Sequence, residues 1–111
     1  MKRCTILTLL MLGCFANTAM AGWVTGKVSS VRIDYDGRGI VTFDTALTSG
    51  ASCGGSYPSS LSFDTGTAGG KSTYALVLAA KATNSTVSAF GLNSCGTYGG
   101  SWVEDWYYGS M

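Results

Sequence analysis

Hydrophobic and polar residues alternate along residues 24–35, but the alternation changes phase partway along. The first phase consists of Val24, Gly26 and Val28, and the second of Val31, Ile33 and Tyr35. Alternation with a period of two is typical of a β-strand with one buried face. Because one extra residue reverses which side chains face inward, the phase change predicts a β-bulge near Ser29-Ser30.

A tight hairpin is expected after this first strand. Asp36-Gly37 lies between two apolar runs, and both residues tolerate the positive φ angles of a short turn. Ile40 to Phe43 forms the predicted return strand. Residues 45–58 are rich in glycine and serine and predict a loop, and residues 61–63 predict a short third strand.

Residues 71–82 change the pattern from alternation to helical spacing. The main apolar stripe consists of Tyr74, Leu78 and Ala82. Residues four apart lie on one face of an α-helix. Gly69-Gly70 should let the chain enter this helix, and Thr83-Asn84 should end it. Apolar residues cover most of the circumference, so we expect the helix to make contacts on more than one side.

Two more strands complete the chain, at Thr86 to Leu92 and at Ser101 to Tyr108. A glycine-rich loop over residues 96–100 separates them. The elements therefore follow the order β-β-β-α-β-β, with no internal repeat and no second domain. We expect a mainly β protein with one helix, whose five strands form a small barrel.

The first 21 residues have the pattern of a secretory signal peptide. A basic start at residues 2 and 3 precedes an apolar run over residues 4–16, and Ala19-Met20-Ala21 places small residues where a signal peptidase cleaves. The apolar run is too short to span a bilayer of about 30 Å. We expect cleavage after Ala21, a single mature domain over residues 22–111, and a secreted or periplasmic protein. Leu12-Gly13-Cys14 also loosely resembles a lipoprotein cleavage box, although its upstream positions fit poorly.

Removal of this leader changes the charge and the cysteine content. The seven basic and six acidic residues of the full chain become five and six, which leaves a net charge of −1 and no basic patch for nucleic acid. Cys53 and Cys95 remain, and in an oxidising compartment we expect them to form a disulfide. Closing a loop of this size contributes about 4 kcal/mol in the chain-entropy model. A free or metal-binding thiol pair is the alternative, but no histidine or C-x-x-C motif supports a zinc site.

The sequence offers little for catalysis. The chain contains no histidine, which excludes Ser-His-Asp and Cys-His arrangements. Ser-Lys chemistry stays open in principle, but a solvated charge is the ordinary role of lysines near helix ends. The pairs Asp34 with Asp36 and Glu104 with Asp105 could serve a glycosidase. We interpret all four instead as charges that keep strand edges and a hairpin soluble. We therefore expect no enzyme, no cofactor and no bound metal.

Large aromatic residues are the strongest candidates for a binding site. Sugar rings stack on aromatic faces, and Trp and Tyr are also enriched at protein interfaces. Trp102 and Trp106 are four residues apart and should face the same side of the last strand, with Tyr107 on the opposite, exposed side. Tyr57 lies in a loop. We take these four as ligand-binding candidates, although for the two tryptophans packing in a core or an interface is the favoured interpretation and ligand contact is the alternative.

Short sequences at the ends of the elements resemble a known group of proteins. They are Phe63-Asp64, Gly69-Gly70-Lys71 at the start of an Ala/Leu helix, Val87 at the start of the next strand, and Asn93-Ser94-Cys95 at its end. These short sequences resemble a broader set of small secreted bacterial proteins. The element order, the leader, the single-domain length and the one long-range disulfide make residues 24–108 similar to the receptor-binding B subunits of AB-type bacterial toxins, such as the cholera-toxin and subtilase-cytotoxin B subunits. The resemblance implies an OB-fold barrel, a pentameric ring with the helices at its centre, and binding of host glycans.

The leading hypothesis is a secreted, non-catalytic binding module of this toxin-B-subunit type. Its expected partners are a glycan or cell-surface glycoconjugate, further copies of the same chain, and an enzymatic A-type subunit. Nucleic acid binding and stable membrane insertion are not expected. The alternative is a periplasmic or secreted protein, such as an inhibitor or an envelope-stress factor, that binds another protein through the aromatic last strand. A small hydrolase that uses the acidic residues is a third hypothesis.

Overall fold

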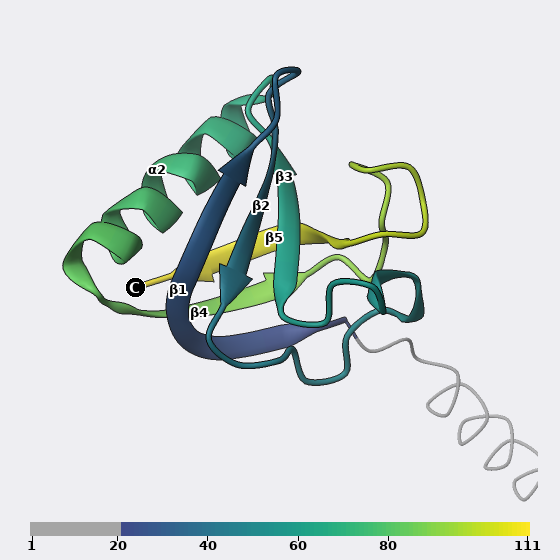
Figure 1. Cartoon of the computed structure of the whole chain (residues 1–111), viewed down its shortest axis with the longest axis horizontal. Coiled ribbons are helices and arrows are strands. Elements are labelled where there is room, and N and C mark those ends of the chain that lie inside the picture. Colours follow the sequence, from purple (N-terminus) through teal and green to yellow (C-terminus); the bar gives the residue numbers. More distant parts are fainter. Residues whose placement is uncertain (1–20) are drawn as a thin grey trace, which may run out of the picture.

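The computed structural model describes residues 21–111, which form five β-strands and one α-helix (Figure 1). In chain order the elements are β1 (Trp23–Ile33), β2 (Arg38–Phe43), a 3-10 helix η1 (Ser52–Gly54), β3 (Ser60–Asp64), α2 (Ala68–Thr83), β4 (Thr86–Gly91) and β5 (Glu104–Ser110). The prediction of a mainly β protein with one α-helix is confirmed. The signal-peptide and lipoprotein motifs lie outside the described residues, apart from Ala21.

The five strands form one sheet in the order β1-β2-β3-β5-β4, and β4 pairs back onto β1, so that the sheet closes on itself. β3 and β5 run parallel, and every other pair of neighbours runs antiparallel. The first half of β1 pairs with β4 and its second half pairs with β2. The register shift between Val28 and Ser30 falls where the pairing changes sides, and it confirms the predicted bulge. In Figure 1, β1 bends strongly along its length. The bulge lies between the part of β1 that pairs with β4 and the part that pairs with β2.

The turn between β1 and β2 reverses the chain over residues 34–37. The Asp34 amide donates to the Arg38 carbonyl at 2.8 Å, and the Gly37 amide donates to the Asp34 carbonyl at 3.0 Å. Gly37 has a φ angle of 91°, a region that residues with a Cβ rarely adopt. The predicted hairpin at Asp36-Gly37 is confirmed.

The helix α2 begins three residues earlier than predicted, so Gly69-Gly70 lies inside its first turn rather than before it. Thr67 caps it, because its hydroxyl accepts a hydrogen bond from the Gly70 amide at 2.9 Å. Asn84 ends it with a φ angle of 53°, as expected for a helix C-cap. Its buried face consists of Gly70, Thr73, Val77 and Ala80 rather than the predicted stripe. These side chains are short, so the helix lies close against the sheet, while the larger Leu78 is exposed.

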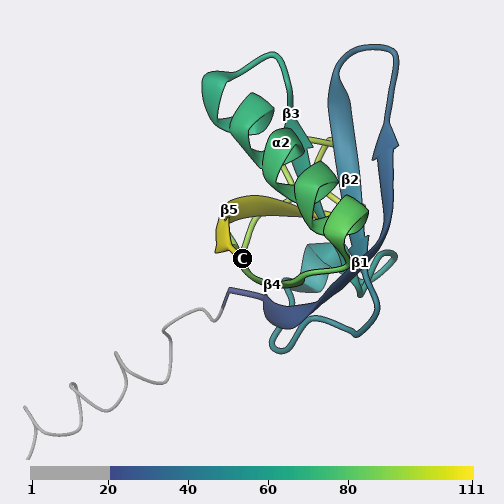
Figure 2. The same ribbon diagram turned by 90° about the vertical axis from the view of Figure 1, so that its left-hand side faces the viewer.

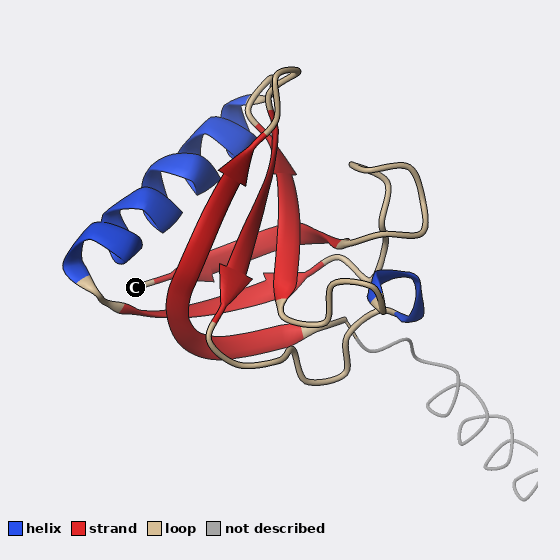
Figure 3. Cartoon of the chain, viewed as in Figure 1, coloured by secondary structure: helices blue, strands red, loops and turns tan. Residues whose placement is uncertain are grey.

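The hydrophobic core lies between the sheet and α2, which packs on β1, β3 and β5 (Figures 2 and 3). Its buried members are Val24, Val28, Val41, Phe43, Leu61, Phe63, Val77, Ala80, Val87 and Ala89. The loops that follow β2 and β4 lie at the opposite end of the molecule from α2 (Figure 3). Within residues 21–111, no helix has the length and apolar character needed to cross a membrane.

Candidate functional site

A cavity of about 250 Å³ opens between the β1–β2 hairpin and the loop that joins β4 to β5. We call it the hairpin cleft, and it is lined by Arg32, Asp34, Arg38, Tyr98 and Trp102. Three of these residues come from the hairpin and two from the loop. Residues about sixty positions apart in the sequence therefore meet in one polar and aromatic opening.

Asp34 is the centre of a charged network in the hairpin cleft. Its carboxylate accepts a hydrogen bond from the Tyr98 hydroxyl at 2.6 Å and one from Arg32 Nε at 2.8 Å. These bonds, that from Tyr98 first, lower the pKa of Asp34 below its ordinary value. Burial and the hydrogen bond to Asp34 raise the pKa of the Tyr98 phenol, and the bond to Asp34 raises the pKa of Arg32. At neutral pH the network therefore holds a carboxylate, a neutral phenol and a guanidinium in fixed positions.

Arg38 joins the hairpin to the β4–β5 loop. Its Nε donates to Asp36 at 2.7 Å, and its Nη1 donates to the Thr97 carbonyl at 3.3 Å. Its guanidinium carbon lies 4.7 Å from the centroid of the Tyr98 ring, within the range of a cation–π contact. Arg38 therefore holds Tyr98 by its ring, while the hydrogen bond to Asp34 holds it by its hydroxyl.

Trp102 and Tyr57 form an aromatic pair at this end of the molecule. Their ring centroids lie 6.1 Å apart with an interplanar angle of 17°, and Trp102 is 51% exposed. The predicted disulfide between Cys53 and Cys95 is present, and it links the loop that carries Tyr57 to the loop that carries Trp102. The disulfide thus limits how far apart the two loops that carry these stacked rings can move.

The other two predicted ligand residues lie elsewhere. Trp106 is half-buried and packs against the hydrophobic core. Tyr107 is 62% exposed and makes an edge contact with Tyr108 at 5.1 Å between centroids. Trp106 and Tyr107 line a second opening of about 290 Å³ beside α2. The prediction that Trp102 and Trp106 share one side of a strand is wrong, because β5 begins only at Glu104 and Trp102 precedes it.

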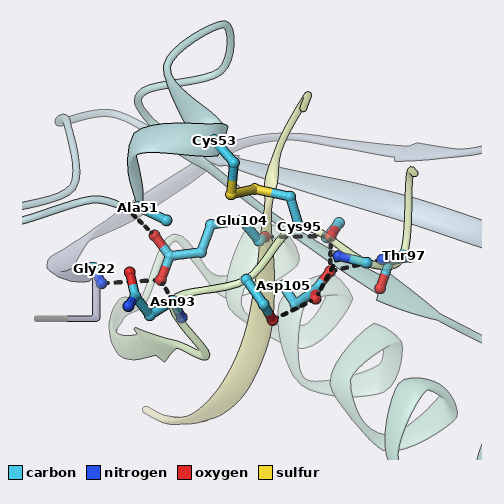
Figure 4. The surroundings of a disulfide bond; sticks show 11 residues. Gly22, Ala51, Cys53, Asn93, Cys95, Thr97, Glu104 and Asp105 are labelled. Carbon is cyan, nitrogen blue, oxygen red and sulfur yellow. Dashed lines mark hydrogen bonds between the residues drawn. A yellow bond between two sulfur atoms is a disulfide. The ribbon is translucent and has the colours of Figure 1, made fainter. Parts of the chain in front are cut away.

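Glu104 is buried, which corrects the prediction that it is a solubilising surface charge. Its side chain is only 1% exposed, and its two oxygens accept hydrogen bonds from three backbone amides (Figure 4). The donors are Gly22 at 2.9 Å, Ala51 at 2.7 Å and Asn93 at 3.1 Å. Buried carboxylates need such partners, and here main-chain groups from three separate segments supply them. Glu104 therefore ties the start of the described chain to the loops on both sides of the disulfide.

Asp105 is also buried, so the surface prediction is wrong for this residue as well. It accepts hydrogen bonds from the amides of Gly96 and Thr97 at 2.8 and 2.9 Å, and from the Ser94 hydroxyl at 2.8 Å. Burial raises the pKa of Asp105, but the hydrogen bonds from Thr97, Ser94 and Gly96 together outweigh it and leave the pKa below its ordinary value. Because Thr97 precedes Tyr98, Asp105 positions the loop that forms one wall of the hairpin cleft.

The hairpin carboxylates are both engaged by hydrogen bonds, Asp34 with Arg32 and Tyr98, and Asp36 with Arg38. Nowhere in residues 21–111 do three or more His, Cys, Asp or Glu side chains gather closely enough to hold a metal ion. Comparisons of the chain with protein-family models, with curated proteins and with solved structures found no match.

The sequence analysis missed Arg32, Arg38 and Tyr98. A usable signal was present for the arginines, because they flank the predicted turn and lie on paired strands, close enough to share its acidic residues. No such signal exists for Tyr98, which lies in a glycine-rich loop. Its position depends on the hydrogen bonds that Asp105 accepts from the backbone beside it, and on the contacts of its own side chain with Asp34 and Arg38.

Proposed function

We propose that this protein is a secreted, non-catalytic binding module with an OB-type barrel, and that it binds a glycan in the hairpin cleft. The observation that carries the proposal is the exposed Trp102, stacked on Tyr57 at the edge of a cleft lined with fixed polar groups. An exposed aromatic face can stack on the apolar face of a sugar ring. Carboxylate, guanidinium and phenol groups beside it can direct the sugar hydroxyls.

The pattern of strand pairing supports the OB-type assignment. The closed order β1-β2-β3-β5-β4, with a single α-helix between β3 and β4, is the connectivity expected of this barrel. OB-folds bind oligosaccharides and oligonucleotides with the face of strands 2–3 and with the loops that follow strands 1 and 4. The hairpin cleft lies between those two loops, so its place in the barrel agrees with a ligand site.

The charge of the site favours sugar over nucleic acid. Arg32 and Arg38 are each paired with an aspartate, Asp34 and Asp36, at 2.8 and 2.7 Å. The cleft therefore presents hydrogen-bonding groups without a positive field, whereas nucleic acid binding depends on uncompensated basic residues.

A receptor-binding subunit of the toxin type would also form a ring and carry an enzymatic partner. The outer face of α2 supports self-assembly, because it exposes Ala75, Leu78, Ala79 and Ala82. Exposed apolar patches of this kind are typical of protein interfaces. Export, indicated by the leader sequence, would place the subunit in the periplasm or outside the cell. Light scattering of the exported protein tests the assembly, and a monomer at high concentration would contradict it.

Glycan binding is tested by a glycan array with three forms of the exported protein. We expect the wild type to bind a defined class of sugar and Tyr107→Ala to bind as the wild type. Trp102→Ala should lose at least about fivefold in affinity, since one stacking or hot-spot contact is worth more than about 1 kcal/mol. Tyr107 is the matched control because it is also an exposed aromatic residue but lies away from the cleft. Equal losses in both variants, or a loss confined to Tyr107→Ala, would place the site elsewhere.

The alternative function, binding to another protein, is favoured by the exposed aromatic residues of β5. Tyr107 and Tyr108 contact each other at the surface, and Phe90 stacks on Tyr108 at 4.7 Å. A blank array, together with a partner protein whose binding is lost in Tyr107→Ala and retained in Trp102→Ala, would support this alternative against the glycan proposal.

A further inference from the structure

Gly22 is held in place by the fold through both of its backbone polar groups. Its amide nitrogen lies 2.9 Å from Glu104 Oε2 in a buried hydrogen bond. Its carbonyl accepts a hydrogen bond from the Gly91 amide at 2.7 Å. Figure 4 shows Gly22 beside the carboxylate, on the side opposite the disulfide. The first residue after the expected cleavage point is therefore a fixed part of the barrel.

The Glu104 carboxylate leaves no room for a Cβ at Gly22 or at Gly91. A Cβ placed on Gly22 would lie 2.6 Å from Glu104 Oε1 and 3.0 Å from Gly50 Cα. A Cβ placed on Gly91 would lie only 1.9 Å from Glu104 Oε2. The backbone at position 22 can approach the carboxylate this closely because the residue is glycine.

Glu104 has no cationic partner within residues 21–111. The ion pairs of this part of the chain are Arg32 with Asp34 and Arg38 with Asp36, both at the hairpin. Three backbone amides satisfy the hydrogen-bonding capacity of Glu104, but none carries a formal charge. A buried carboxylate without a counter-charge is costly, and a nearby cation would reduce that cost.

We propose that the missing counter-charge is the α-ammonium group of the mature chain, created when the leader is removed. Hydrolysis of the Ala21–Gly22 bond by a signal peptidase consumes one water, leaves a carboxylate on Ala21 and frees the amino group of Gly22. An α-amino group has an ordinary pKa of about 8, so it is protonated at neutral pH. The nitrogen that donates one neutral hydrogen bond to Glu104 in the precursor becomes a cation at the same place.

Cleavage of the leader then adds an ion pair to the fold, in addition to separating the mature chain from the leader. Glu104 also binds Ala51 and Asn93, which flank the two disulfide cysteines Cys53 and Cys95. The new ion pair therefore strengthens a junction where the N-terminus, the β2–β3 loop and the β4–β5 loop meet, and the last of these also lines the hairpin cleft. This inference rests on the expected export and is independent of whether the cleft binds a glycan.

The test moves the new charge by one residue and leaves the rest of the junction unchanged. The full chain is expressed with its own leader, the exported product is purified, and its mass shows where it begins. A matched variant carries one extra alanine between Ala21 and Gly22, so that cleavage after Ala21 leaves the ammonium one residue farther away while Gly22 keeps its amide hydrogen bond. Both forms are also made with Glu104→Gln, and urea unfolding gives the equilibrium constant for each.

We expect the wild-type product to begin at Gly22. The variant with the inserted alanine should have an equilibrium constant for folding about tenfold or more below that of the wild type, as for removal of one partner of a buried pair. In the Glu104→Gln background the same insertion should have little effect. A product that begins at another residue, or an insertion effect that is absent or equal in the two backgrounds, would overturn the proposal.

If Glu104→Gln does not fold, selective acetylation of the Gly22 amino group in the wild-type product replaces it. The acetylated form keeps the amide hydrogen and loses the charge, as in the precursor. It should show the same loss in folding constant as the inserted alanine. An acetylated protein as stable as the wild type would overturn the proposal.

Discussion

Two adjacent glycines in the first turn of α2 should respond in opposite ways to substitution by alanine. A Cβ on Gly69 meets no atom within 4 Å, whereas a Cβ on Gly70 would lie 1.7 Å from the carbonyl oxygen of Asp64. In an open helical site alanine is favoured over glycine by up to about 1 kcal/mol, and we expect about 0.5 kcal/mol in a first turn. Gly69→Ala should therefore raise the free energy of unfolding by this small amount.

Gly70→Ala should instead lower the free energy of unfolding by about 3 kcal/mol. The Asp64 carbonyl cannot move away freely, because it accepts hydrogen bonds from the Thr67 amide at 3.1 Å and the Thr67 hydroxyl at 2.8 Å. Relief of the clash requires a shift of the helix against β3, which typically costs about 1–3 kcal/mol, and loss of the Thr67 cap, which costs about 1 kcal/mol more.

Urea unfolding followed by tryptophan fluorescence measures both variants against the wild type. With a slope of about 2 kcal/mol per molar urea for a domain of this size, Gly70→Ala should move the midpoint down by about 1.5 M and Gly69→Ala should move it slightly up. A Gly70→Ala midpoint equal to or above that of Gly69→Ala would refute the close packing of α2 on the end of β3.

Three further predictions concern the polar and covalent links of the loops. Asp105→Asn should lower the free energy of unfolding by about 3 kcal/mol, because an amide nitrogen would replace an oxygen that accepts two hydrogen bonds; a urea midpoint equal to that of the wild type would contradict this. The pKa values of Asp34 and Asp105 lie below 3.8, so the stability they provide is present above that pH and is lost as the pH falls through their lowered values. Thermal melts from pH 5 to pH 2 should show a falling melting temperature, and the fall should be smaller in Asp105→Asn. Replacing Cys53 and Cys95 together by alanine should cost about 4 kcal/mol, and an unchanged melting temperature would refute this value.

Local sequence signals predicted the strands, the bulge and the turn because those features depend on neighbouring residues. The phase change at Ser29-Ser30 marks the bulge since side chains alternate strictly along a strand. The buried face of α2 was not predictable in the same way. Its periodicity favours the stripe with Tyr74 and Leu78, but the space between helix and sheet accepts only short side chains, and that space is set by the tertiary packing.

The candidate site could be predicted only in part. Tyr57 and Trp102 were named as ligand-binding candidates, and the disulfide that links their loops was expected from the cysteine count. Their separation from Trp106 and Tyr107 was not expected, because it depends on where β5 begins. The strand begins at Glu104, where it pairs with Leu61 of β3, and nothing in the local alternation marks that position.

Glu104 and Asp105 show what the pattern of hydrophobic and polar residues does not reveal, namely where backbone amides bind a buried carboxylate. Glu104 and Asp105 were assigned to the surface as charges that keep strand edges soluble. Burial of an ionised group without partners costs several kcal/mol. Their partners are mostly main-chain amides from distant loops, and an amide is present at every residue except proline, so it leaves no mark in the pattern of side chains. What does leave a mark is the absence of a side chain where the backbone approaches, as at Gly22 and Gly91. Glycines that recur where loops should meet a charged residue are therefore a sequence signal for a carboxylate buried among main-chain donors.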